Sequence, residues 1–134
     1  MQWTAREYTR AEAATLAGMP EGSLDSLIHH ARDVATLFSE KRKGRRFFSL
    51  RDIAVLRVAH EFVHGGRDWL VAIGIAYDRL EHPPPPDALI VAPAVIRRGC
   101  GPPIITTTPP DAFDRSTIVV PVGRIVADII RRAA

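Results

Sequence analysis

Cysteine is almost absent from this chain of 134 residues, since Cys100 is the single one. No intrachain disulfide can form, and the sequence holds no metal site built from several cysteines. This usage fits a reducing compartment, and we expect the protein to lie in the cytoplasm. The sequence also lacks an apolar run of membrane-spanning length, a signal-peptide pattern and an internal repeat, so we expect no membrane partner.

Patterns that mark common catalytic sites are missing as well. The chain has no glycine-rich phosphate loop, no nucleophile elbow and no paired-carboxylate arrangement. Hydrophobic residues make up 46% and charged residues 25%, which predicts a folded chain rather than a disordered one. We therefore expect a folded protein that is not an enzyme and has no cofactor.

The formal net charge is only +3, but positive charge gathers in one place. The stretch from Lys41 to Arg46 has five cations around Gly44, although residues 1–82 as a whole hold nearly equal numbers of cations and anions, twelve Lys and Arg against eleven Asp and Glu. The β-prone runs 35–39 and 46–48 flank it and predict a hairpin with a basic tip. Such a tip beside a helix can grip phosphate, although a charge run can also be a solvated turn.

Two helical patterns precede this hairpin. Thr9 and Glu12 form a capping box at the start of the first, and Gly18-Met19-Pro20 ends it. The second buries one apolar face, formed by Leu24, Leu27, Ile28 and Ala31. Two short helices joined by a glycine-containing turn predict a helix-turn-helix.

Two further helices are predicted after the hairpin. Ser49 is expected to cap the third helix, with Asp52 at its N3 position, and Gly65-Gly66 ends it. A fourth helix is expected from about residue 68 to residue 80, with Trp69 and Tyr77 on its buried side.

The four prolines at 83–86 predict an extended segment and divide the chain into a domain at 1–82 and a segment at 83–134. Residues 88–92, 104–107 and 117–120 predict short strands, and a short helix follows Pro121. We expect its apolar stripe to pack on the preceding strands or on a second copy of the chain. We favour a homodimer through this stripe, with a protein partner for the segment as an alternative; the stripe consists of Val122, Ile125, Val126, Ile129 and Ile130.

This order of elements resembles the MerR-type winged-helix DNA-binding domain. The family pattern opens with Tyr-Thr and a short helix, as in residues 8–18, and its wing ends in Gly-x-Arg-x-aromatic-Ser before Asp-Leu, as in residues 44–53. The match covers about residues 8–80 and is most specific from Gly44 to Leu56. The resemblance implies a mainly α fold with a small β content: a winged helix-turn-helix of four helices and a hairpin wing, then a short strand and helix segment.

The resemblance also implies a function. Family members are dimeric transcription regulators, bacterial or phage, that place the second helix in the major groove of double-stranded DNA and the wing on its backbone. We therefore expect a sequence-specific, homodimeric, nucleoid-associated regulator, or alternatively an excision or architectural factor such as shorter relatives in mobile elements. The expected DNA-binding residues are Thr9, Arg10, Ser23, Ser26, His29, His30, Lys41, Arg42, Lys43, Arg45 and Arg46.

The chain departs from the family pattern in two places. The second helix lacks the usual arginine and aromatic pair and carries Glu21 and Asp25 instead. This acidic character favours a third alternative, a winged-helix protein-interaction module such as a toxin or inhibitor. The long dimerisation helix and the effector cysteines of the family are also missing, so we expect no metal-sensing role.

The string His60-Glu61-x-x-His64 matches the zinc-protease pattern H-E-x-x-H. It places two imidazoles one helical turn apart, with a carboxylate beside them as a candidate general base. However, the same helix fits the winged-helix pattern, and no third ligand has a recognisable spacing. A zinc hydrolase is therefore the least favoured alternative, we predict no metal site, and we interpret Cys100 as an incidental thiol.

Overall fold

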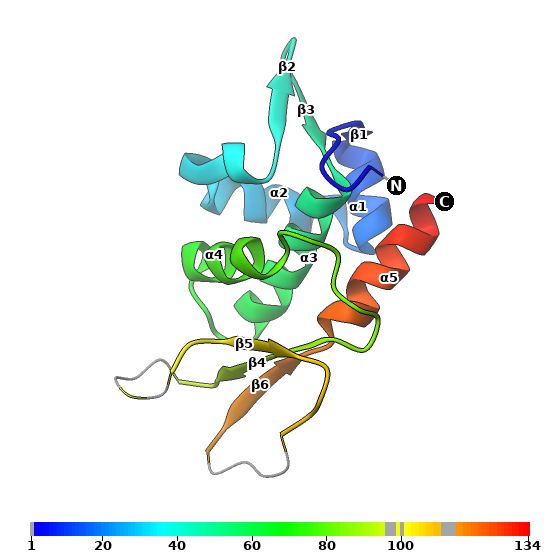
Figure 1. Ribbon diagram of the computed structural model, residues 1–134. Helices are drawn as coiled ribbons and strands as arrows, with labels where there is room; N and C mark the ends of the chain where they lie inside the picture. Colours follow the sequence, from blue (N-terminus) through cyan, green and yellow to red (C-terminus); the bar gives the residue numbers. More distant parts are fainter. Residues whose placement is uncertain (1, 96–98, 100, 111–114) are drawn as a thin grey trace.

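The computed structural model describes residues 2–95, 99, 101–110 and 115–134. In this part of the chain, helices combine with two small antiparallel sheets, so the predicted mixture of helices with a small β content is confirmed (Figure 1). The elements of the described residues are β1 (Tyr8–Thr9), α1 (Arg10–Ala17), α2 (Glu21–His30), the 3₁₀ helix η1 (Arg32–Leu37), β2 (Glu40–Arg42), β3 (Arg45–Phe48), α3 (Leu50–His64), α4 (Trp69–Arg79), β4 (Leu89–Pro93), β5 (Ile104–Thr106), β6 (Thr117–Val120) and α5 (Val122–Ala133). Among these, no helix has the length and apolar character needed to cross a bilayer.

Helices α1 and α3 each begin with the predicted capping box. The Thr9 hydroxyl accepts a hydrogen bond from the Glu12 N–H at 3.3 Å, and the Glu12 carboxylate accepts one from the Thr9 N–H at 3.1 Å. Ser49 and Asp52 form the same two hydrogen bonds at the start of α3, at 3.0 and 2.8 Å. An N-cap side chain of this kind contributes about 1 kcal/mol to stability.

The strand predicted for residues 35–39 is wrong, because this part of the chain forms η1 and the turn after it. Ala35 and Phe38 are both buried, and their i, i+3 spacing matches the 3₁₀ repeat rather than the alternation of a strand. The Ser39 hydroxyl donates to the Ala35 carbonyl at 2.7 Å and so satisfies an acceptor of the last turn. The hairpin therefore begins at Glu40, later than its sequence pattern indicates.

The hairpin itself is formed by β2 and β3. Lys41 lies opposite Arg46 and Arg42 opposite Arg45, so Lys43 and Gly44 form a two-residue turn. Both turn residues have positive φ, 51° and 78°, as a type I′ turn requires. Strand β1 pairs with the other side of β3, and Phe48 at the base is fully buried. Figure 1 shows this hairpin projecting beyond the helices at one end of the molecule.

The hydrophobic core is built around α3, which packs against α1, α2, α4 and α5. Trp3 closes it near the end of α4, where its indole N–H donates to the carbonyls of Leu80 and Glu81 at 3.4 and 3.2 Å. The core includes residues from before and after the prolines at 83–86. The predicted boundary therefore lies between two segments that pack together. The largest fully buried side chains include Leu27, Phe38, Phe48, Phe62, Leu80, Ile90 and Ile129.

The second sheet lies at the opposite end of the molecule from the hairpin (Figure 1) and has the order β5-β4-β6. Its strands lie close to the predicted ranges. Ala88, Ile90 and Ala92 alternate toward the core. From this sheet α5 runs back along α3 and α1, and the Arg132 guanidinium donates to the Leu16 carbonyl at 3.0 Å. Both chain ends consequently lie on the same side of the molecule (Figure 1).

The apolar stripe of α5 packs mainly within its own chain. Val122, Val126 and Ile129 are at most 1% exposed, whereas Ile125 and Ile130 are partly buried. The stripe contacts α1 and α3, in addition to strand β4. In this fold the three buried residues are covered by their own chain. Homodimerisation through the stripe stays a prediction.

Candidate nucleic-acid interface

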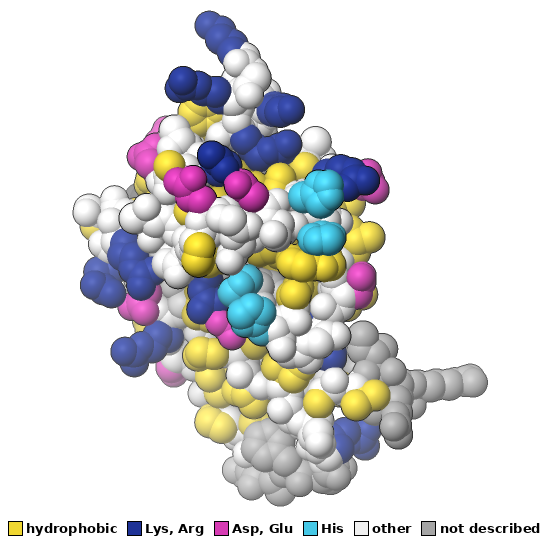
Figure 2. Space-filling view, turned by 180° about the vertical axis from the view of Figure 1, so that it is seen from behind, with side chains coloured by type: hydrophobic (Ala, Val, Ile, Leu, Met, Phe, Trp, Pro, Cys, Tyr) yellow, Lys and Arg dark blue, Asp and Glu magenta, His cyan; other side chains and the backbone are white. Residues whose placement is uncertain are grey.

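Three cationic side chains project from the hairpin into solvent. Lys41, Lys43 and Arg45 are exposed, and none of their side chains forms a hydrogen bond or an ion pair with another described residue. They lie on both strands and in the turn, which places three positive charges within a few residues of one another. Figure 2 shows dark blue Lys and Arg side chains at this end of the molecule. Such a cluster attracts anionic groups, and the phosphates of nucleic acid are one class of them.

The other two hairpin cations brace the hairpin. The Arg42 guanidinium lies over the Phe47 ring at 4.1 Å and donates to the Arg6 carbonyl at 2.6 Å. The Arg46 guanidinium donates to the Ser39 hydroxyl at 2.7 Å. Because both side chains are held against the protein, they fix the direction of the hairpin.

Arg6 extends this support and is a residue that the sequence interpretation missed. Its Nε lies 2.9 Å from Oδ2 of Asp52, and its Nη2 donates to the Thr36 carbonyl at 3.1 Å. Asp52, the N3 residue of α3, is 2% exposed. The capping box identified Asp52 as part of a helix start. However, no local pattern indicates an ion pair to a residue 46 positions earlier in the chain.

The predicted recognition helix α2 presents a different surface. Ser23 is half-buried, while Ser26, His29 and His30 are exposed. The His30 ring stacks on the Trp69 ring, with centroids 4.5 Å apart and 13° between the planes, and His29 meets His30 edge-on at 5.5 Å. Trp69, expected in the core, is half-buried and forms this stack at the surface. The structure therefore joins α2 to the start of α4 through stacked aromatic rings.

Arg10 and Thr9, the predicted DNA-binding residues of the first helix, are both used within the protein. Arg10 lies 2.7 Å from Asp25 and 3.6 Å from Glu21, both on α2. The hydrogen bond to Asp25, followed by the charges of Asp25 and Glu21, raises the pKa of Arg10 above its ordinary value. The Thr9 hydroxyl caps α1. In Figure 2, carboxylates accordingly lie among the cations below the hairpin.

The two histidines of the H-E-x-x-H string lie together on the last turns of α3. Their ring centroids are 4.1 Å apart. Burial, then the charge of His64, then that of Arg57 lower the pKa of His60, while Glu61 opposes them. The Glu61 carboxylate forms an ion pair with Arg57 at 2.5 Å. Among the residues that the structure describes, no group of three His, Cys, Asp or Glu side chains could hold a metal ion, and Cys100 lies outside the described residues.

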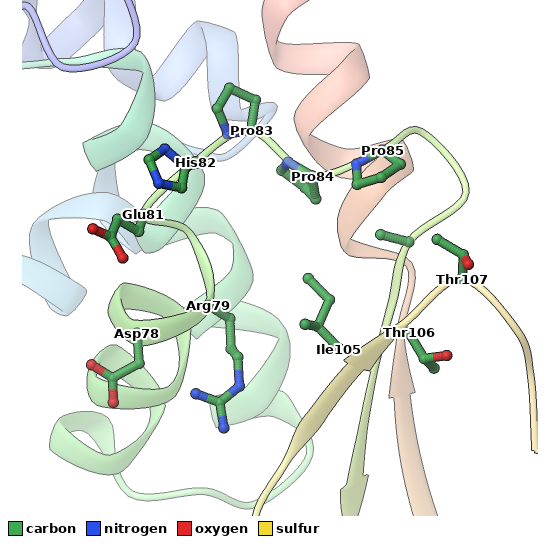
Figure 3. A pocket seen from close by; sticks show the side chains of 11 residues that line it. Asp78, Arg79, Glu81, His82, Pro83, Pro84, Pro85, Ile105, Thr106 and Thr107 are labelled. Atoms are coloured by element: carbon green, nitrogen blue, oxygen red, sulfur yellow. The ribbon is translucent and has the colours of Figure 1, made fainter.

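An open pocket of about 620 Å³ lies between the end of α4, the proline run and β5, and sequence reasoning did not indicate it (Figure 3). Asp78 and Glu81 contribute carboxylates, and His82 an imidazole. The Arg79 guanidinium is held by the Pro103 carbonyl at 2.6 Å. The lining mixes both signs of charge, and Thr106 and Thr107 add hydroxyl groups. Its lining residues are Asp78, Arg79, Glu81, His82, Pro83, Pro84, Pro85, Ala88, Ile105, Thr106 and Thr107.

No protein-family model matches this chain, and no curated protein matches it. The hairpin with its three unused cations is therefore the main evidence for a function.

Proposed function

We propose that this protein binds double-stranded DNA through the β2–β3 hairpin, as a winged helix-turn-helix protein of the MerR type, and that it regulates transcription. The observation that carries the proposal is the set of exposed cations at Lys41, Lys43 and Arg45, whose side chains have no ion-pair partner in the described part of the chain. The Arg6–Asp52 ion pair and the hydrogen bonds of Arg42 and Arg46 hold the hairpin in place. A charged group that is already oriented loses less conformational entropy when it binds.

The arrangement of the helices supports the same proposal. Helices α1 and α2 are joined by Gly18-Met19-Pro20, and Gly18 adopts φ 67°, which ends α1 and turns the chain. The order of a helix pair, a β-hairpin and a long helix is the order of the MerR pattern. In this proposal the hairpin is the wing and α2 lies at the major groove.

The charge distribution makes the hairpin the main source of affinity. Arg10 is neutralised by Asp25 and Glu21, so α2 adds little positive charge. Three phosphate contacts predict that the logarithm of the binding constant falls with the logarithm of salt concentration with a slope of about −3. We therefore expect strong dependence on salt and modest discrimination between DNA sequences.

The test is a mobility-shift titration on the protein's own promoter at about 50 and about 200 mM salt. The double variant Lys43→Ala/Arg45→Ala should weaken binding at least tenfold at the lower salt and reduce the slope by about 2. The matched control is Arg124→Ala/Arg131→Ala, which removes two exposed charges from α5 and should leave affinity nearly unchanged. Absence of a complex at low salt, or an equal loss in both variants, would contradict the proposal.

One observation favours a second candidate function, protein interaction through α2. The exposed face of this helix carries Glu21 and Asp25 paired with Arg10, a pattern that suits a protein surface better than a DNA groove. If the hairpin variant and the wild-type protein both fail to bind DNA, Asp25→Ala provides the next test, in binding to a partner isolated with the full chain.

A further inference from the structure

His60 and His64 form a pair that has no role in the proposed DNA binding. They occupy positions i and i+4 of α3, so both rings lie on one side of the helix. The ring centroids are 4.1 Å apart, and the ring planes are inclined by 49° to each other. Two imidazoles at this separation can direct one nitrogen each toward a common ion.

The pair is open to solvent. His64 is exposed and His60 is half-buried, and Figure 2 shows histidine side chains at the surface of this face of the molecule. The neighbouring carboxylate of Glu61 is occupied by Arg57, at 2.5 Å. Helix α3 ends directly after His64, at Gly65. The partial negative charge at a helix C-terminus favours a bound cation.

We propose that His60 and His64 together chelate one divalent ion of a late transition metal, namely Cu²⁺, Ni²⁺ or Zn²⁺. Imidazole nitrogen is a preferred ligand of these ions, whereas Mg²⁺ and Ca²⁺ select oxygen ligands. Water fills the remaining coordination positions, because the described residues offer no third side chain of a ligating type in a common group. The order of affinity follows the general series for such ligands, with Cu²⁺ above Ni²⁺ and Zn²⁺.

The surroundings of His60 set the expected strength of the site. Its Nδ1 is buried and has no hydrogen-bond acceptor or donor among the described residues. Metal-binding histidines in tight sites have their second nitrogen held by such a partner, and its loss lowers affinity about 10- to 100-fold. We therefore expect a reversible surface site, weaker than a closed site with four protein ligands.

The test is calorimetric titration of the full chain, without an affinity tag, with Ni²⁺ at neutral pH. We expect one ion per chain and at least tenfold weaker binding in His64→Gln, whose exposed side chain leaves the fold intact. His60→Asn should give the same loss. Mg²⁺ should give no binding signal in the wild-type protein.

Two controls decide whether the effect belongs to this pair. His82→Gln removes an exposed histidine, and His29→Gln/His30→Gln removes an adjacent pair whose rings meet edge-on. Both variants should bind Ni²⁺ as the wild type does, and Cys100→Ser should as well. Unchanged affinity in His64→Gln, or loss of the site in any of these controls, would overturn the proposal. If His60→Asn does not fold, His64→Gln alone decides.

Discussion

Arg6 and Asp52 form an ion pair at the base of the hairpin, with Nε of Arg6 2.9 Å from Oδ2 of Asp52. The same carboxylate accepts the hydrogen bond from the Ser49 N–H that begins α3. Arg6 also donates to the Thr36 carbonyl in η1. One buried carboxylate therefore joins the N-terminal segment to the start of α3, and Arg6 links both to η1 below the hairpin.

Replacing this carboxylate should destabilise the protein. We predict that Asp52→Ala lowers the free energy of unfolding by about 2–4 kcal/mol, because it removes part of a capping box and leaves Arg6 without its counter-charge. Urea unfolding followed by circular dichroism measures the change. The control is Asp128→Ala, which breaks the exposed pair with Arg131 and should cost no more than about 0.5 kcal/mol. Equal losses of unfolding free energy in the two variants would show that the Arg6–Asp52 contact contributes no more to stability than an exposed ion pair.

Gly123 at the start of α5 should tolerate no side chain. A Cβ there would lie 2.7 Å from the Ala88 nitrogen, and it would meet the Pro85 carbonyl oxygen even more closely. We predict that Gly123→Ala destabilises the protein by about 1–3 kcal/mol, because α5 must move away from the proline run. Gly74→Ala in α4 is the matched control. Its Cβ would meet nothing within 4 Å, so the higher helix propensity of alanine should stabilise the protein by up to about 1 kcal/mol. Thermal unfolding should show a lower melting temperature for Gly123→Ala and a higher one for Gly74→Ala than for the wild type.

A substitution at Lys43 can separate the effect of hairpin charge on DNA binding from the effect of hairpin stability. It adopts φ 51°, a region that asparagine enters more readily than lysine. We predict that Lys43→Asn raises the free energy of unfolding by a few tenths of a kcal/mol, up to about 1, while it weakens DNA binding. The salt slope should decrease by about 1. Lys41→Asn removes the same charge from strand β2 and should weaken binding without the gain in stability. If Lys43→Asn were more stable and also bound DNA more tightly than the wild type, the DNA-binding role of the Lys43 charge would be contradicted.

His60 should contribute to the pH dependence of stability. Burial, with help from the charges of His64 and Arg57, lowers its pKa in the folded protein below the ordinary 6.5. Between these two pKa values the unfolded chain binds more protons than the folded chain. The contribution of neutral His60 is therefore complete above about pH 6.5 and is lost as the pH falls through the folded pKa.

The corresponding measurement is urea unfolding at several pH values from about 7.5 to about 5, in the presence of a chelator. Wild-type stability should decline toward acid, and His60→Gln should show a shallower decline. His82→Gln, which removes an exposed histidine, should follow the wild type. An equally steep decline in His60→Gln would mean that His60 titrates normally.

The features that were predictable from the sequence are those encoded within a few residues. Thr9 with Glu12 and Ser49 with Asp52 satisfy the first N–H groups of a helix through neighbours three positions away, so their patterns are visible in the sequence. The alternation around Ile90 likewise indicates its strand. The strand prediction for residues 35–39 rested on their β-prone side chains. The same side chains also fit a 3₁₀ turn, and in the structure this turn buries Phe38.

The candidate site depends on contacts between distant residues, and these were less predictable. The cations from Lys41 to Arg46 were evident, but their division into free and bracing side chains depends on Arg6, Ser39 and Phe47. The neutralisation of Arg10 likewise needs the packing of α1 against α2. The amphipathic pattern of α5 predicts that one face of the helix is buried, but it does not predict which elements cover that face.

The burial of α5 against α1 and α3 has a consequence for how the chain folds during synthesis. Val122, Val126 and Ile129 complete a core whose other side is made more than a hundred residues earlier, by residues such as Ala13. A nascent chain that has reached the proline run leaves the ribosome with this face of α1 and α3 uncovered. We therefore expect stable folding to wait until residues 122–133 have emerged, because the apolar face of α1 and α3 stays uncovered until then.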